Sequence, residues 1–265
     1  METIKMITID LDGTLLRSDG SVSDHTVETL QKARQKGVIV AIATGRMYQT
    51  AKAYGERLAL GDSPMLLFAG GLIQTLESKK ILFQQTVPRQ DAQDLVNLAR
   101  EQSWQMQTYI DDVLRVELDE PWIRDYERTT KSRPSSAAMN FTAYRATAIN
   151  SSAGGHEELL ERKALIEKTF PGRFNILFSD LTFLEIMPLG VDKGHGIRRL
   201  GELYDVDPKY IMAIGDSEND LDMLKAAGFS VAMANAGQEV KDAANYVTLS
   251  NDEDGVAAVV EKFVL

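Results

Sequence analysis

Two carboxylic acids follow the first apolar run of the chain at a spacing that lets them act on one ligand. Asp10 and Asp12 stand within the stretch ITIDLDGTLL, and Gly13 and Thr14 come directly after them. A carboxylate buried at the end of a strand is costly unless it is paired, hydrogen-bonded or bound to a metal. A carboxylate can also accept a phosphoryl group while a neighbouring carboxylate transfers protons. The pair therefore indicates phosphoryl transfer, with Asp10 as the nucleophile and Asp12 as the general acid and base.

Two later stretches also place polar residues directly after apolar runs. Thr44 and Gly45 follow VIVAIA, and Asp216 follows IMAIG. Ligands of open parallel sheets bind beyond the carboxyl ends of the strands, so we expect these residues to share one site. Carboxylates from two strands suit Mg²⁺, which takes one or two carboxylates, waters and phosphate oxygens. The Thr44 hydroxyl and the backbone amides beside Gly13 and Gly45 suit a phosphate group.

A phosphate group beside several carboxylates needs compensating positive charge. At ~4 Å, two like unit charges near a protein surface repel by about 4 kcal/mol. A bound divalent cation would offset part of this repulsion, because it is often the largest charge in its site. Lys193, in the stretch GVDKGHG, is the candidate side chain for offsetting the rest. We also expect an apolar surround for Asp12, since it follows an apolar strand.

The elements that must position these residues alternate between strands and helices in the first and last thirds of the chain. Continuous apolar runs such as VIVAIAT, at 38–44, are typical of parallel strands covered on both faces. Ser23 is a candidate N-cap for a helix that ends at Gly37, and a second helix follows Gly45. Such alternation favours βαβ units and an open parallel sheet. The other predicted elements are strands at 6–10, 65–69, 210–215, 230–234 and 246–250, and helices around Ile197, over 219–228 and over 254–264.

The middle of the chain has a different pattern. Two amphipathic stretches, DAQDLVNLAREQ at 91–102 and HEELLERKALIEKTF at 156–170, predict helices. The stretches MQTYIDDVLRVEL at 106–118 and FTAYRATAI at 141–149 have the composition of strands. We therefore predict an α+β insertion at residues 83–185, between two halves of one core at residues 1–82 and 186–265.

Composition narrows the class of protein further. The chain has 265 residues, a net charge of -10 and no cysteine, which excludes disulfides and a cysteine nucleophile. The sequence has no basic stripe for nucleic acid and no apolar run of membrane-spanning length, so neither partner is expected. The first residues lack the layout of a signal peptide, and the expected location is the cytoplasm.

Four stretches, in this order, resemble the motifs of the haloacid dehalogenase superfamily of phosphotransferases: DLDGT, ATGR, LEIMPLGVDKG and GDSENDLDML. The large insertion between the second and the third is similar to that of the Cof-like sugar phosphatases. The resemblance implies a Rossmann-like catalytic core, and an α/β cap domain at residues 83–185 that closes over the site. It also implies Asp10 as nucleophile, Asp12 as general acid and base, and Mg²⁺ as the cofactor.

The same resemblance assigns ligand-binding roles to further residues. Those implied to hold magnesium are Asp10 through its carboxylate, Asp12 through its backbone carbonyl, Asp216, and Asp220 as a ligand or a residue behind the ligands. Those that would bind phosphate are Thr44, Gly45, Lys193 and Asn219, the last by helping to order the lysine.

One stretch departs from the family pattern. Relatives often carry NGA after the third core strand, whereas FAGGLI places Ala69 where that asparagine would stand. A polar contact near the substrate is therefore expected to be missing, which bears on the choice of leaving group. Arg46, beside Thr44, is the candidate for contacting the leaving part of the substrate. The candidates for specificity in the insertion are Tyr109, Asp111, Asp112 and Arg115.

These observations predict a magnesium-dependent phosphatase that acts on a small phosphorylated metabolite, most simply a sugar phosphate. A phosphomutase would use the same aspartyl-phosphate but return the phosphoryl group to the sugar. A dehalogenase fits less well, because Asp12 offers acid chemistry that a carbon–halogen displacement does not need. A phosphate- and metal-binding regulatory protein without turnover is the alternative outside the enzymes, and the intact acids argue against it. The sequence fixes no oligomeric state, and a monomer is compatible with it.

Overall fold

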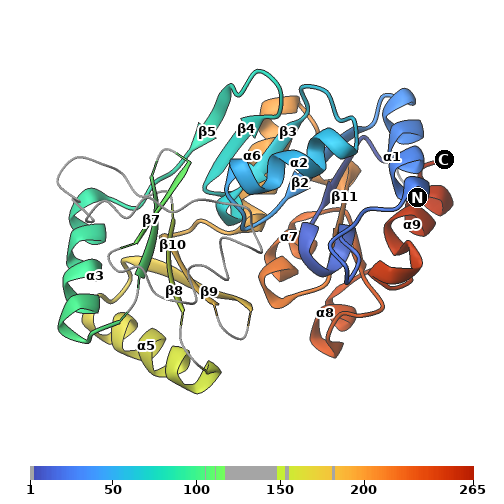
Figure 1. The fold of residues 1–265 in the computed structure, drawn as a ribbon. Coiled ribbons are helices and arrows are strands. Elements are labelled where there is room, and N and C mark those ends of the chain that lie inside the picture. The colour runs from blue at the N-terminus through green and yellow to red at the C-terminus, as the bar shows by residue number, and fades with distance from the viewer. Residues whose placement is uncertain (1–2, 105, 111, 117–147, 153–154, 181–182) are drawn as a thin grey trace. The chain divides into compact units, whose positions relative to one another are not determined.

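The computed structural model describes all residues except 1–2, 105, 111, 117–147, 153–154 and 181–182 (Figure 1). The chain forms two compact units. The larger unit comprises Met1–Arg46, Ala51–Phe83 and Asp192–Leu265, and the smaller unit comprises Met47–Thr50 and Gln84–Val191. The predicted boundary at 185/186 falls inside strand β10 (Phe183–Pro188). That strand stays with the smaller unit because it pairs with β8 and β9.

The larger unit is built on a mainly parallel sheet with the strand order β13-β12-β11-β1-β2-β3-β4-β5. Strand β1 lies between β2 and β11 and is parallel to both, so the carboxyl ends of these three strands meet at one edge. The strands are β1 (Met6–Ile9), β2 (Ile39–Ala43), β3 (Pro64–Leu67), β4 (Leu72–Thr75), β5 (Ile81–Gln84), β11 (Ile211–Gly215), β12 (Phe229–Ala232) and β13 (Tyr246–Val247).

Helices separate most of these strands in the sequence, as the alternating pattern predicts. They are α1 (Asp24–Gln35), α2 (Tyr48–Arg57), α6 (Lys193–Tyr204), α7 (Leu221–Ala226), α8 (Gln238–Ala243) and α9 (Gly255–Phe263). The predicted N-cap of α1 is confirmed, because the Ser23 side chain accepts a hydrogen bond from the Thr26 backbone N–H. In the described part of the chain, no helix has the length and apolar character that crossing a membrane requires.

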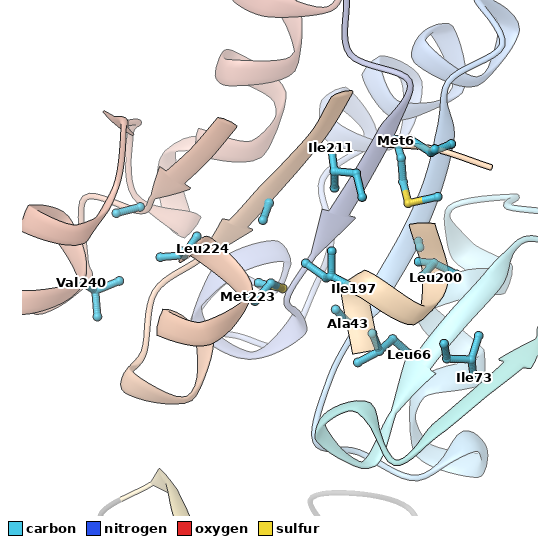
Figure 2. Packing of buried hydrophobic residues seen from close by; sticks show 14 of the residues in the cluster. Met6, Ala43, Leu66, Ile73, Ile197, Leu200, Ile211, Met223, Leu224 and Val240 are labelled. Carbon is cyan, nitrogen blue, oxygen red and sulfur yellow. The ribbon is translucent and has the colours of Figure 1, made fainter. Parts of the chain in front are cut away.

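Buried side chains lie on both faces of the larger sheet. On one face, Met6 and Leu66 pack against Ile197 and Leu200 of α6 (Figure 2). Neighbouring strand residues point to opposite faces, and Ile7, on the other face, is also fully buried. The expectation of strands covered on both faces is therefore confirmed, and the unit has an α/β fold with a Rossmann-like sheet.

The third core strand ends earlier than predicted. Strand β3 stops at Leu67, and the next residues form a short helical turn, Phe68–Gly70. Phe68 and Ala69 have φ values of 48° and 47°, and Gly70 has 101°. The chain reverses here, so that β4 runs antiparallel to β3. The edge of the sheet is thus mixed rather than parallel.

The smaller unit has an antiparallel sheet with the order β7-β6-β8-β10-β9. The predicted helices are present as α3 (Arg89–Glu101) and α5 (His156–Thr169), and within the predicted strand region at 106–118 the described residues form two paired antiparallel strands. Most of the predicted strand at 141–149 lies outside the described residues. The strands are β6 (Met106–Ile110), β7 (Val113–Val116), β8 (Ala148–Ser152), β9 (Phe174–Asp180) and β10. Apolar residues of α3, α5 and the sheet form one buried cluster, so this unit has a core of its own.

Candidate active site

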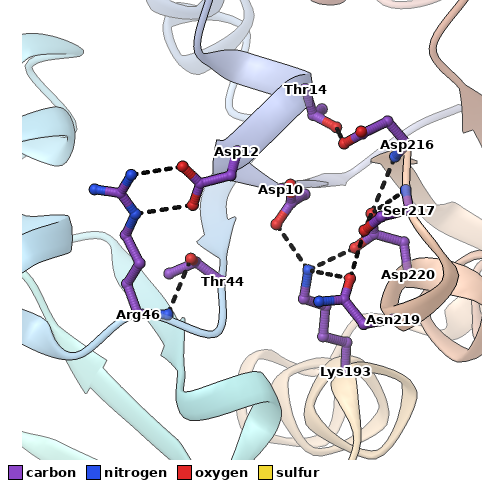
Figure 3. A network of polar contacts seen from close by, with 10 residues as sticks. All are labelled: Asp10, Asp12, Thr14, Thr44, Arg46, Lys193, Asp216, Ser217, Asn219 and Asp220. Carbon is purple, nitrogen blue, oxygen red and sulfur yellow. Dashed lines mark hydrogen bonds and ion pairs between the residues drawn. The ribbon is translucent and has the colours of Figure 1, made fainter. Parts of the chain in front are cut away.

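Three strand ends bring an acid, a hydroxyl and a second acid to one edge of the larger sheet. Asp10 follows β1, Thr44 follows β2 and Asp216 follows β11 (Figure 3). The Asp10 backbone N–H donates to the carbonyl oxygen of Ile214 at 3.0 Å, which fixes Asp10 against β11. The structure therefore brings these predicted site residues together in the way that the carboxyl ends of parallel strands require.

A wide helical turn, Leu11–Leu15, follows Asp10 and lies close to Asp216. Gly13 has a φ of +80°, and a Cβ atom there would lie 2.4 Å from Asp216 Oδ2, so only glycine fits without displacing that carboxylate. The buried Thr14 donates from Oγ1 to Asp216 Oδ1 at 2.7 Å. The sequence-based site did not include Thr14, although its position directly after the two acids was a usable signal.

Lys193 lies at the centre of the acid cluster (Figure 3). Its Nζ is 2.7 Å from Asp10 Oδ1, 2.6 Å from Asp220 Oδ1 and 3.2 Å from Asn219 Oδ1. Lys193 begins α6, whose N-cap is Asp192, and only 1% of its side chain is exposed. Burial opposes its charged form, but the carboxylates of Asp10 and Asp220 outweigh burial and raise the pKa of Lys193. The lysine therefore stays positively charged.

The carboxylates around Lys193 carry more negative charge than it neutralises. Burial raises the pKa of Asp10 well above its usual value; Lys193 opposes this rise, and the neighbouring carboxylates add to it. Burial likewise raises the pKa of Asp216 to about 6, although the Thr14 hydrogen bond opposes that shift. A cluster with this excess of negative charge is suited to a divalent cation.

The donor set also fits a magnesium ion. One carboxylate oxygen from each of Asp10, Asp216 and Asp220 lies within 4.8 Å of the others. Asp220, however, already accepts from Lys193 at one oxygen, and from the backbone N–H groups of Asp216 and Ser217 at the other, at 3.0 and 3.1 Å. Its geometry therefore suits a residue that holds the loop and the lysine, whereas Asp10 and Asp216 are better disposed as ligands.

Asp12 does not have the apolar surround that the sequence suggested. Its side chain is 57% exposed and is paired with the Arg46 guanidinium. Arg46 Nε lies 2.8 Å from Oδ2, and its Nη2 lies 2.5 Å from Oδ1, which makes the pair bidentate. Burial opposes the charged form of Arg46, but Asp12 outweighs it and raises the pKa of Arg46. The expectation was wrong because Asp12 lies in the turn after the strand, where side chains reach solvent.

Thr44 is buried beside Arg46. Its Oγ1 accepts from the Arg46 backbone N–H at 3.1 Å, and its carbonyl oxygen accepts from the Ala69 N–H at 3.0 Å. In the hydrogen bond from Arg46 the Thr44 hydroxyl is the acceptor. Its own proton can therefore be donated to an anion. Gly45 lies between these two residues, so its amide belongs to the same turn. Ala69 is fully buried in the turn that supports Thr44.

The candidate specificity residues belong to the smaller unit. Tyr109 is buried on β6 and donates from its hydroxyl to Gln107 Oε1 at 3.0 Å. Arg115 is on β7, and Asp112 lies in the turn between the two strands. Asp111 lies outside the described residues. Their relation to the substrate stays a prediction.

The sequence and the fold of the chain are similar to those of known proteins. The sequence profile of a family described as haloacid dehalogenase-like hydrolase matches residues 7–260. A Bacillus subtilis protein named 5-amino-6-(5-phospho-D-ribitylamino)uracil phosphatase is 33% identical, over 99% of this chain and 96% of its own. The crystal structure of a haloacid dehalogenase-like hydrolase from Bacteroides thetaiotaomicron superposes with a TM-score of 0.89 at 30% identity, covering 98% of this chain and 99% of the other. A Thermotoga maritima crystal structure gives a TM-score of 0.87 at 29% identity, with coverage of 99% and 98%.

Proposed function

Because the chain belongs to the haloacid dehalogenase-like hydrolase family, we propose that it is a magnesium-dependent phosphatase working through an aspartyl-phosphate. The observation that carries the proposal is the buried Asp10 carboxylate, held 2.7 Å from the buried Lys193 and beside Asp216. Few structural roles require this arrangement, because burying several acids around one lysine is costly to folding. A nucleophile that must face a phosphate group would account for the burial of these acids around the lysine.

In the proposed reaction, Asp10 and Asp12 divide the chemistry. An Asp10 carboxylate oxygen attacks phosphorus, and the bond from phosphorus to the leaving oxygen breaks. Asp12 donates a proton to that oxygen, then removes a proton from the water that hydrolyses the aspartyl-phosphate. The exposed Asp12 side chain can take up this first proton from solvent and turn from Arg46 toward a substrate. Inorganic phosphate and the free alcohol are the products.

Positive charge and hydrogen-bond donors would hold the phosphate group. Lys193 offers its ammonium group, Thr44 its hydroxyl and Gly45 its backbone amide, while Asn219 helps to orient the lysine. The residues that would hold Mg²⁺ are Asp10 and Asp216 through their carboxylates and Asp12 through its backbone carbonyl, with Asp220 behind them. The ion, when bound, would offset the negative charge of the acids and of the phosphate oxygens.

We propose a phosphorylated sugar or sugar alcohol as the substrate class. The Bacillus subtilis relative is named for a substrate with a phosphate on a ribityl chain, which supports a polyol phosphate. We also propose that the smaller unit acts as a cap that selects the leaving group, and that the reaction takes place in the cytoplasm.

The test is phosphate release from a panel of phosphorylated metabolites, with Mg²⁺ or with EDTA. We expect release that requires Mg²⁺ and that falls by at least about a thousandfold in Asp10→Asn, which keeps the shape but removes the nucleophile. Asp242→Asn, an exposed change on α8, is the matched control and should retain full activity. Release that survives Asp10→Asn would overturn the assignment of the nucleophile. Exchange of label between sugar positions without net release would identify a phosphomutase instead.

A further inference from the structure

The segment that follows the two acids is tied to a loop near the C-terminal end of the chain. Arg17 Nη2 lies 2.8 Å from Asp254 Oδ1. Ser18 donates to the carboxylate of Asp252 twice, from its backbone N–H at 2.9 Å and from its hydroxyl at 2.6 Å. The loop itself is a short helical turn, Asn251–Glu253, closed by a capping box. Segments 234 residues apart in the sequence are therefore bound to each other.

Two asparagines extend this connection to the turn that carries Asp12. Asn235 donates from Nδ2 to the carbonyl oxygen of Gly13 at 2.8 Å. Its Oδ1 accepts from the backbone N–H of Asn251 at 3.1 Å. Asn251 in turn donates from Nδ2 to the carbonyl oxygen of Leu16 at 2.8 Å. The linked pair thus holds two carbonyl groups, one within the turn and one directly after it.

The Gly13 carbonyl is where this connection meets the proposed catalytic residues. Gly13 lies between Asp12 and Thr14, and Thr14 is hydrogen-bonded to Asp216 (Figure 3). Glycine has the widest backbone freedom of any residue, because it has no side chain to limit φ and ψ. A hydrogen bond to its carbonyl therefore restricts the backbone at this point. Freedom at this point would move the Asp12 carboxylate, and a shift of about 1 Å in a reacting group can cost about a hundredfold in rate.

We propose that Asn235 and Asn251 are positioning residues, which hold the Asp12–Thr14 turn in the geometry that proton transfer requires. This inference rests on the proposed function, because it assigns the pair to the proton-transfer step of that reaction. Neither asparagine contacts the three acids around Lys193, so the pair acts through the backbone of the turn.

Asn235→Asp is the variant that isolates the hydrogen bond to Gly13. It keeps the size of the side chain and an acceptor for the Asn251 N–H, but it puts an oxygen where the donor was. We expect kcat to fall about tenfold while KM changes less than about twofold, since the turn binds no leaving group. Asn235→Ala should show the same division between kcat and KM.

Asn245→Ala is the matched control. Asn245 also joins a loop to a strand through its side chain, because its Oδ1 accepts from the Ser230 backbone N–H at 2.8 Å and from the Ser230 hydroxyl at 2.9 Å. We expect this variant to lower the Tm and to leave kcat unchanged. A loss of kcat equal to that of Asn235→Ala would mean that the effect is one of general stability, which would overturn the inference.

Hydrogen exchange gives a second readout that needs no turnover. Backbone N–H groups of Leu15 and Leu16 donate to Asp10 and Leu11 within the turn, so their exchange reports its order. Exchange over residues 11–16 should be faster in Asn235→Asp and unchanged in Asn245→Ala. Unchanged exchange, or faster exchange with an unchanged kcat, would overturn the inference. A wild-type protein that releases no phosphate would instead overturn the proposed function, while exchange would still show whether the pair anchors the turn.

Discussion

At the scale of single residues, the acid cluster lowers the stability of the metal-free fold and favours the binding of a cation. Lys193 contributes one positive charge to a space that three carboxylates share. In the metal-free chain burial, with a further contribution from the neighbouring carboxylates, raises the pKa of both Asp10 and Asp216. A raised pKa of an acid means that its ionised form is disfavoured in the folded state, so the site destabilises the metal-free fold at neutral pH.

Asp216→Asn tests both the stability of the metal-free fold and the affinity for a cation. The amide keeps an oxygen that can accept from Thr14, and it removes one negative charge from the cluster. In EDTA at pH 7.5 we expect the variant to unfold with a free energy up to about 3 kcal/mol higher than the wild type, from a shift of about two pKa units. Addition of Mg²⁺ should stabilise the wild type and leave the variant unchanged. Urea unfolding with and without Mg²⁺ measures both effects.

The same change has a defined pH dependence. The folded-state pKa of Asp216 is about 6 and the ordinary pKa of an aspartate is 3.8, so the folded state binds more protons between these two values. The metal-free wild type therefore loses stability, relative to Asp216→Asn, as pH rises from 4 to 6, and the difference is constant above that range. A difference that grows toward pH 4 would contradict the burial of this carboxylate.

Much of the site follows from the sequence because its residues stand at strand ends. The apolar runs before Asp10, Thr44 and Asp216 are sufficient to bring these residues to one edge of a parallel sheet. The pairing of Asp12 with Arg46 could not be predicted in the same way, since it depends on the path of a turn. The hydrogen bonds that occupy Asp220 are likewise a matter of loop geometry, on which the order of motifs carries no information.

At the scale of elements, the turn Phe68–Gly70 stores backbone strain beside Thr44. Two consecutive residues other than glycine adopt positive φ there, which costs about 1–2 kcal/mol for each. The Phe68 N–H donates to the Arg46 carbonyl at 3.2 Å, and the Ala69 N–H donates to the Thr44 carbonyl at 3.0 Å. Strain of this kind persists when the surrounding structure fixes the conformation, and it often lies near functional sites.

Ala59 and Ala69 form a matched pair for measuring this strain. Both have positive φ, of 51° and 47°, but Ala59 is exposed and Ala69 is fully buried. Ala59→Gly should stabilise the protein by up to about 1 kcal/mol, because relief of strain exceeds the entropy that glycine adds to the unfolded chain. Ala69→Gly should increase the free energy of unfolding by less, because it also removes a buried methyl group worth about 0.8 kcal/mol. Urea unfolding decides the order, and a destabilised Ala59→Gly would contradict the strain.

Two physical causes account for the parts of the fold that the sequence did not predict. Continuous apolar runs located β1 and β2, and apolar periodicity located α3 and α5, because burial determines these elements. The early end of β3 and the reversal into β4 depend on positive φ at Phe68 and Ala69, for which neither residue type is a signal. The short helix α8 buries only Val240, which is too little apolar surface to produce a recognisable pattern.

At the scale of the whole molecule, the two units have separate hydrophobic cores. Residues of α3, α5 and the antiparallel sheet form the core of the smaller unit, while the acid cluster lies entirely in the larger unit. A ligand that binds only the folded form stabilises the unit that contains its site. Magnesium should therefore act on one unit and not on the other.

Two optical signals can separate the units. Trp104 packs against the core of the smaller unit and the larger unit contains no tryptophan, so tryptophan fluorescence does not follow the larger unit, whereas circular dichroism follows both. With Mg²⁺ at about 100 times its Kd, the larger unit should gain about 2.7 kcal/mol. We expect the dichroism transition to move to higher temperature and the fluorescence transition to stay. Equal shifts of both signals would mean that the units unfold together.

The position of β1 between β2 and β11 has a consequence for how the protein is made. Thr8 of the first strand donates a hydrogen bond to Met212, which lies 204 positions later in the sequence, so the ribosome must finish most of the chain before that neighbour exists. Residues 84–191 are almost all of the smaller unit and leave the ribosome as one uninterrupted piece. The inserted unit can therefore fold before the last strands of the sheet that carries Asp10 have been synthesised. The acids of the site come together only near the end of synthesis.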